Sequence, residues 1–251
     1  MEFHFTEIED PLARIDELAR FVKWWYGGNS WDLGASESEL ASLKMPGVLR
    51  RFYGFVREWP VDPLPNGQAH TGFAEGIIDP PEHKNFNEEN GTVFFYEDTQ
   101  GCMACYTTVE TDDPPVLCSA EWYDEEVCAS PRLSDFLLPA CLEEVFYGGL
   151  CHDLTSCDDW WPDVRAKLKP LVNKVDFFPN NSRTFYLLNG SILISEGARL
   201  KLAWKTEQDR LWIDSQGWLT KSKGIITIGD GSTVQISDEG DELRITQGRW
   251  K

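Results

Sequence analysis

Apolar residues in the first quarter of the chain recur every three or four positions, as they do along one face of an amphipathic helix. This spacing predicts a helix that begins at Asp10-Pro11, with proline in its first turn, and ends at Gly27-Gly28. The apolar face of that helix comprises Leu12, Ile15, Leu18, Ala19 and Val22. Ser36 and Glu39 match a capping box, which predicts a second short helix, and Pro46 predicts the start of a third.

From Gly91 onward the pattern changes to the β-branched and aromatic runs that are typical of strands. Three such runs, separated by turn-forming residues, predict an antiparallel meander over Thr92–Tyr96, Met103–Val109 and Val116–Tyr123. A helix is then predicted over Asp135–Tyr147, with Ser134 as its cap and Pro139 in its early turns.

The last third of the chain reads mainly as strands. The acidic segment Asp153–Asp163 leads through a short helix to a hairpin over Phe185–Ile194, whose turn is Asn189-Gly190. Further strands are predicted at Leu200–Trp204, Leu211–Ile213, Gly224–Ile228, Thr233–Ile236 and Glu242–Thr246.

These elements predict an α+β fold in which N-terminal helices pack on an antiparallel β-sheet and a C-terminal β-rich section extends that sheet. No flexible linker interrupts the 251 residues, so we expect a single unit over 1–251, with its β-rich section at 166–251.

The charge of the chain is strongly uneven. The formal net charge is -19; residues 166–251 hold 13 Lys and Arg against 10 Asp and Glu, and residues 1–165 hold the remaining 10 against 32. An anionic field of this kind repels nucleic acid and anionic membranes and attracts basic proteins. We therefore expect a protein partner, no nucleic acid and no membrane, although acidic proteins also use such charge simply to stay in solution.

The cellular compartment is predicted from three features. The chain has no apolar run of membrane-spanning length, no secretory signal pattern, and seven cysteines without framework spacing. These features favour a cytoplasmic protein with reduced thiols.

Common catalytic motifs are missing from the sequence, and neither a catalytic residue nor a cofactor is predicted. The sharpest local motif is Cys102-x-x-Cys105. Residues three apart on a strand point to opposite faces, which favours ordinary thiols over redox chemistry. A metal site completed by Cys151, His152 and Cys157 stays open as an alternative.

Adjacent carboxylates occur at several places along the chain, and we expect five of these clusters to form solvated faces or the rim of a surface that binds a basic partner. The clusters are Glu88-Glu89, Asp112-Asp113, Asp124–Glu126, Glu143-Glu144 and Asp158-Asp159.

Several segments occur in an order that resembles the SUKH superfamily, the Smi/Knr-type proteins that include many bacterial toxin-immunity proteins. They are a proline-initiated helix in Leu43–Tyr53, a strand and turn in Gly91–Gly101, the strand entry Asp113–Val116, the pair Trp122-Tyr123, and Leu133–Leu138. The resemblance covers roughly residues 36–150. Its motif residues, which we interpret as scaffold, are Pro46, Gln100, Gly101, Pro114, Pro115 and Phe136.

The resemblance implies a non-catalytic protein of immunity type that neutralises a toxin domain by occlusion. The acidic charge of residues 1–165 indicates that this toxin domain is basic and that the occlusion is electrostatic as well as steric. There are two alternatives. One is a peptide or small-ligand adaptor in cell-envelope regulation, and the other is an enzyme with an unrecognised site. A pocket lined by tryptophans would favour the adaptor, and a deep pocket that gathers Cys, His and acidic groups would favour the enzyme. Candidate binding residues are Trp31, Trp59, Asp124, Glu125, Glu126, Asp158, Asp159, Trp160 and Trp161.

Overall fold

The structure is a computed structural model, and it describes most of the chain. The described residues are 2–26, 34–56, 86–97, 101–121, 124–148, 151–154, 160–176, 182–197, 200–216, 218, 225–227, 233–235 and 244–246. Side chains are not described at Thr6, at 147–148, 151–154 and 173–176, or from residue 225 onward.

The N-terminal part consists of helices and one antiparallel sheet. The helices are η1 (Phe5–Glu7), α1 (Pro11–Trp25), α2 (Glu37–Ala41) and α3 (Gly47–Tyr53). The first sheet has five strands in the order of the chain: β1 (Phe86–Asn87), β2 (Thr92–Glu97), β3 (Met103–Thr108), β4 (Val116–Ala120) and β5 (Val127–Ser130). The predicted α+β class is confirmed.

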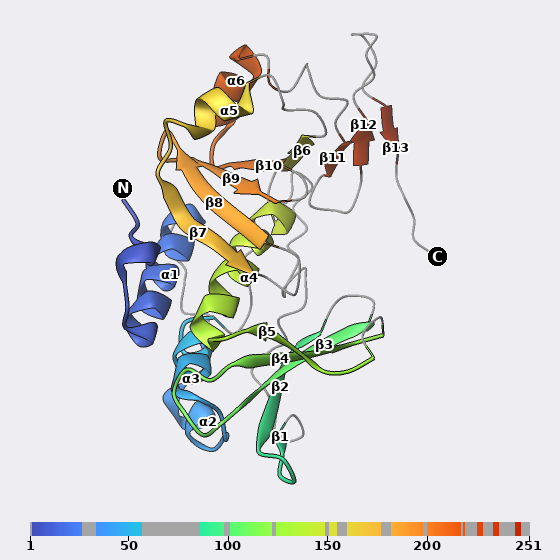
Figure 1. The fold of residues 1–251 in the computed structure, drawn as a ribbon. Coiled ribbons are helices and arrows are strands. Elements are labelled where there is room, and N and C mark those ends of the chain that lie inside the picture. Colours follow the sequence, from blue (N-terminus) through green and yellow to red (C-terminus); the bar gives the residue numbers. More distant parts are fainter. Residues whose placement is uncertain are drawn as a thin grey trace.

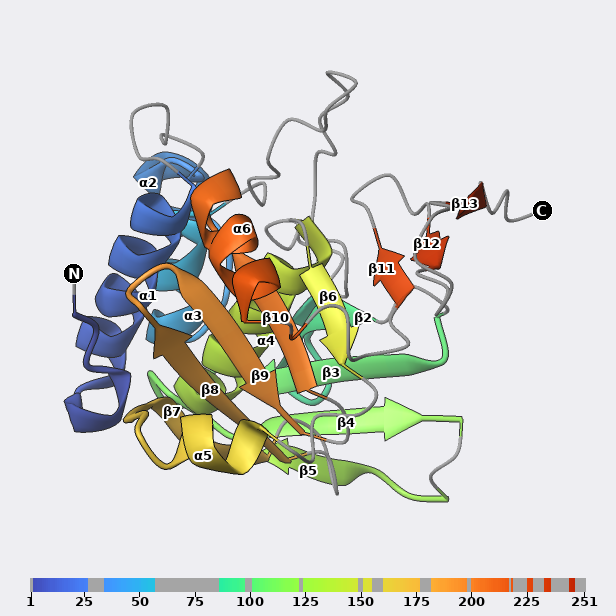
Figure 2. The ribbon, with the colours of Figure 1, turned by 90° about the horizontal axis from the view of Figure 1, so that it is seen from above.

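The C-terminal strands form a second sheet and do not extend the first one as predicted. Its eight strands run in the order β13-β12-β11-β6-β10-β9-β8-β7. They are β6 (Cys151–Leu154), β7 (Pro170–Asp176), β8 (Ser182–Leu188), β9 (Ile192–Glu196), β10 (Leu200–Trp204), β11 (Ile225–Thr227), β12 (Thr233–Gln235) and β13 (Arg244–Thr246). Two further helices, α5 (Trp161–Arg165) and α6 (Glu207–Ser215), lie on this sheet (Figures 1 and 2).

Helix α4 (Leu133–Gly148) lies between the two sheets (Figure 1). It contacts β5 of the first sheet, β7 and β10 of the second, and helices α1 and α3. Almost every side chain from Leu133 to Phe146 is buried, because the helix is apolar on all sides and has a neighbour on each of them. One hydrophobic cluster therefore includes residues of the N-terminal helices, the first sheet, α4 and the second sheet.

Local sequence signals identified several elements correctly. Asp10 caps α1 by accepting bonds from two backbone N–H groups, and the Ser36–Glu39 capping box of α2 is present. Asn189 and Gly190 both have positive φ, of 52° and 75°, as a tight hairpin turn requires. Leu12, which we placed on the apolar face of α1, is instead 38% exposed.

Other elements were missed or wrongly assigned. Strands β1, β5, β6 and β7 were not predicted. The segment predicted as a strand at Leu211–Ile213 lies in α6, which Thr206 and Asp209 begin with a capping box. The capping signal was present in the sequence, but the short apolar run was interpreted as a strand.

The N-terminus of α4 is capped by a residue from the β3–β4 loop and not by Ser134. The Asp113 carboxylate accepts bonds from the Ser134 backbone N–H at 2.7 Å, from the Ser134 hydroxyl at 2.8 Å and from Arg132 Nε at 2.9 Å. Pro114 contributes its carbonyl, which accepts the Leu133 N–H at 2.8 Å. The expectation that Asp113 is a solvated carboxylate is therefore wrong, since it satisfies a helix end that would otherwise lack partners.

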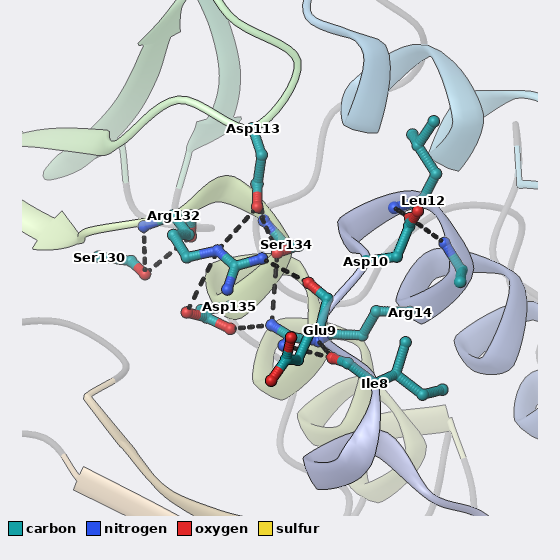
Figure 3. A network of polar contacts seen from close by, with 11 residues as sticks. Ile8, Glu9, Asp10, Leu12, Arg14, Asp113, Ser130, Arg132, Ser134 and Asp135 are labelled. Carbon is teal, nitrogen blue, oxygen red and sulfur yellow. Dashed lines mark hydrogen bonds and ion pairs between the residues drawn. The ribbon is translucent and has the colours of Figure 1, made fainter.

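Two arginines connect this capping network to the start of α1 (Figure 3). Arg14 of α1 is paired with Asp135 in the first turn of α4, and its Nη2 donates to the Ile8 carbonyl at 2.7 Å. Arg132 donates to the Glu9 carbonyl at 3.3 Å. The network thus joins three segments that are far apart in sequence: the start of α1, the β3–β4 loop and the start of α4.

Replacement of Asp113 tests this cap. We expect Asp113→Ala to lower the free energy of unfolding by about 2 kcal/mol, because a helix cap and a partly buried ion pair are lost together. Urea unfolding measures the change. Asp112→Ala, at the exposed neighbouring position, is the matched control and should stay within about 0.5 kcal/mol of the wild type. Equal effects of the two substitutions would contradict the capping role.

Candidate protein-binding surface

The predicted binding residues fall into three groups. Trp31, Trp59, Asp158 and Asp159 lie outside the described residues, as does the motif residue Gln100. Trp160 and Trp161 lie beside the second sheet. Asp124, Glu125 and Glu126 lie at an exposed turn of the first sheet.

The two tryptophans at the start of α5 belong to a hydrophobic cluster on the face of the second sheet that points away from α4. Trp161 is only 7% exposed, and its indole N–H donates to Glu196 at 2.9 Å. Trp160 is half-buried and stacks on Trp218, with 4.2 Å between ring centroids. Trp161 therefore packs in the interior and is not available as a surface anchor, and Trp160 offers a partner little free ring area.

The acidic turn, Asp124–Glu126, connects β4 to β5. All three residues are exposed, and within the described part of the chain none of them forms an ion pair. In Figures 1 and 2 the β4–β5 connection lies at the end of the first sheet that is remote from helices α1–α3. Glu97, at the end of β2, and Glu121, just after β4, are also exposed and lie at this end of the sheet. The turn is thus part of a larger acidic surface.

The scaffold residues of the family motif have identifiable structural positions. Pro46 is the N-cap residue of α3, and Gly101 has a φ of 70° in the β2–β3 connection. Pro115 accepts a bond from the Thr107 hydroxyl at 2.8 Å, and Phe136 packs edge-on against Phe95. A helix cap, a turn, a backbone hydrogen bond and core packing are roles that stabilise the fold.

A groove of about 1290 Å³ runs between α1, α2 and α3. The Arg51–Asp16 ion pair, with 2.6 Å between Nε and Oδ1, lies along it. The described residues that line the groove include no Cys, His or Trp. It therefore has neither the chemistry that we expected of an enzyme pocket nor the tryptophan lining that we expected of an adaptor.

Glu143, which we expected at a solvated face, is instead the centre of a buried ion cluster between α4 and the second sheet. Its carboxylate accepts bonds from the Ser195 hydroxyl and from Lys201 Nζ, both at 2.8 Å. Arg183 Nε lies 3.5 Å from the same carboxylate. Glu143 is 5% exposed and Ser195 is fully buried, so this cluster is closed to a substrate. Glu144, its neighbour, is also buried at 1% exposure.

Among the described residues, the members of the alternative metal site belong to different sheets, and Cys157 lies outside the described residues. Cys105 is buried opposite Cys118 in the first sheet, whereas Cys151 and His152 lie in β6 of the second. Burial, with a hydrogen bond to Cys118, raises the pKa of the Cys105 thiol, and burial likewise raises the pKa of Cys141. Such thiols are poor nucleophiles and poor ligands. Among the described residues no three His, Cys, Asp or Glu side chains form a group that could hold a metal ion.

None of the helices in the described ranges has the length and apolar character needed to cross a bilayer. Comparison of the chain with protein-family models, with curated proteins and with solved structures gives no match. The SUKH resemblance therefore stays a prediction from the sequence motifs.

The Glu143 cluster makes a specific prediction for stability. Glu143→Gln keeps the size of the side chain but removes the buried negative charge that Arg183 and Lys201 share, and we expect the free energy of unfolding to fall by about 3 kcal/mol. Glu125→Gln, at the exposed acidic turn, is the control and should change it by less than about 0.5 kcal/mol. Chemical unfolding followed by circular dichroism decides between these outcomes. A Glu143→Gln protein of wild-type stability would show that the cluster does not contribute.

Proposed function

We propose that the chain is a non-catalytic protein-binding protein of immunity type. It binds a basic toxin domain and neutralises it by steric and electrostatic occlusion. The observation that carries this proposal is the acidic turn, Asp124–Glu126, which is exposed and lacks ion pairs within the described residues.

Electrostatics supports this role. Adjacent carboxylates repel one another, and a cationic surface that docks beside them replaces that repulsion with attraction. The formal charge of -19 extends the attraction beyond the turn and speeds the encounter with a basic protein. Occlusion needs no catalytic group, since a partner held against this surface cannot reach its own substrate.

The resemblance to the SUKH superfamily gives independent support, because that superfamily includes many toxin-immunity proteins. Two of its segments, Asp113–Val116 and Leu133–Leu138, are joined by the Asp113 capping network, which holds the β3–β4 loop to the start of α4. The acidic turn lies at the opposite end of that sheet from the network, where a partner can approach without disturbing it.

The partner is sought first among the products of the neighbouring genes. A basic toxin domain encoded there is purified with the chain and titrated calorimetrically at low salt and at about 0.5 M salt, where charges are screened within a few ångströms. Formation of a complex, with loss of toxicity in cells that produce both proteins, supports the proposal. Failure of every basic neighbouring product to bind overturns it.

Charge reversal at the acidic turn locates the electrostatic contribution. We expect Glu125→Lys together with Glu126→Lys to weaken binding at low salt by about tenfold or more, with the difference shrinking as salt rises. The control, Asp163→Lys with Asp214→Lys, makes the same change in formal charge at exposed positions of α5 and α6. Equal weakening by both pairs would mean that net charge alone, and not the turn, attracts the partner.

A further inference from the structure

Four side chains form a continuous row across the first sheet on the face that points away from α4. Phe94 of β2 lies opposite Tyr106 of β3, Tyr106 opposite Leu117 of β4, and Leu117 opposite Cys128 of β5. Residues directly opposite one another in an antiparallel sheet share a face. We call these four residues the outer row.

The outer row is apolar and only partly covered. Phe94, Tyr106 and Leu117 are half-buried and Cys128 is exposed. None of them belongs to either hydrophobic cluster of the described residues, although their neighbours on the opposite face, such as Val93 and Cys118, are fully buried. The three large side chains therefore lie in a row outside the core.

The second sheet differs from the first because both of its faces pack against other elements. Leu193 of β9 joins the cluster around α4, and Ile192 and Ile194 join the cluster beneath α5 and α6. Both faces of that sheet thus pack against described elements (Figure 1). The first sheet, by contrast, packs one face against α4, and no described helix packs against the outer row on its other face.

Carboxylates border the outer row on the side of the acidic turn. In the next row of the same face Glu97 lies opposite Ala104, and Ala104 lies opposite Ser119. Glu97 ends this row on β2, and Glu126 immediately precedes β5 at the other side of the sheet. Desolvation raises the pKa of Glu126, as expected for a carboxylate that lies close against protein surface.

We propose that the outer row and its two bordering carboxylates, Glu97 and Glu126, are the surface that docks the basic partner. The partner that fits is a protein segment that lays an apolar side chain across Tyr106 and Leu117 and places lysine or arginine beside the carboxylates. This inference rests on the proposed function and names the surface that performs it. Its pattern, an apolar centre with an aromatic anchor and a charged rim, is that of protein interfaces.

Charge selects a basic partner over a second copy of the chain. Two copies that met through this face would bring two acidic surfaces together, on molecules that each carry a formal charge of -19. A cationic partner gains from the same arrangement, because its charges are opposite to those of the rim.

Substitutions in the outer row test the surface through their effect on the affinity for the toxin domain, once a neighbouring gene product has been shown to bind. We expect Tyr106→Ser and Leu117→Ser each to weaken binding about tenfold or more, because each removes an anchor from the centre of the contact. Leu211→Ser is the matched control, since Leu211 is 52% exposed on α6, and it should bind as the wild type does. Thermal unfolding of each variant shows that the fold is retained, and Glu97→Lys gives a second test at an exposed position.

The outcomes separate this inference from the proposed function. A toxin domain that binds the wild type and the outer-row variants, including Glu97→Lys, equally well overturns the docking surface and leaves the proposed function standing. If no basic domain binds the wild type at all, both proposals are overturned.

A defined probe tests the same surface without the natural partner. A short synthetic peptide of alternating lysine and leucine presents one basic and one apolar face as a strand. Its titration into the isotopically labelled full chain should shift the amide resonances of Phe94, Tyr106, Leu117 and Ser119. Shifts confined to other acidic segments, such as Glu88-Glu89 and Glu110, would contradict the inference.

Discussion

The burial of α4 between two sheets is the constraint on which the rest of this structure depends. A helix that is apolar on every side is stable in water only if every side has a neighbour, and here the two sheets and helices α1 and α3 provide them. Each half of α4 is also fixed by a polar network. Asp113 holds the first turn to the first sheet, and Glu143 joins the later turns to Lys201 and Arg183 of the second. One helix thus links the two sheets through both apolar and ionic contacts.

This arrangement determines which surfaces remain for a partner. The second sheet has one face against α4 and the other beneath α5 and α6, so its tryptophans serve mainly as packing. One face of the first sheet packs against α4. Among the described residues, the outer row and the acidic turn lie outside the hydrophobic core. A protein that acts by occlusion requires a rigid surface more than a reactive group, and a sheet supported from behind by a buried helix provides one.

The sequence was most informative where the signal is local. Asp10-Pro11, the Ser36–Glu39 pair and Asn189-Gly190 each specify a helix start or a turn within a few residues, and all three were recognised. The burial of Glu143 could not be predicted, because its partners Arg183 and Lys201 come from strands far along the chain. Asp113 was misread for the same reason, since its capping bonds go to a helix that begins after two intervening strands. The outer row became visible only once the register of four strands was known, because no single strand contains more than one of its residues.

We infer that α4 makes the two sheets one cooperative structure that holds the outer face of the first sheet in place. Hydrogen exchange of the free protein in increasing denaturant tests this claim most directly, because it reports the opening free energy of each segment. If α4 couples the two sheets, the protected amides of β3 and β4, of α4 and of β8–β10 converge on one common free energy of opening. Exchange of β8–β10 at a distinctly lower free energy, while α4 and the first sheet stay protected, would contradict it.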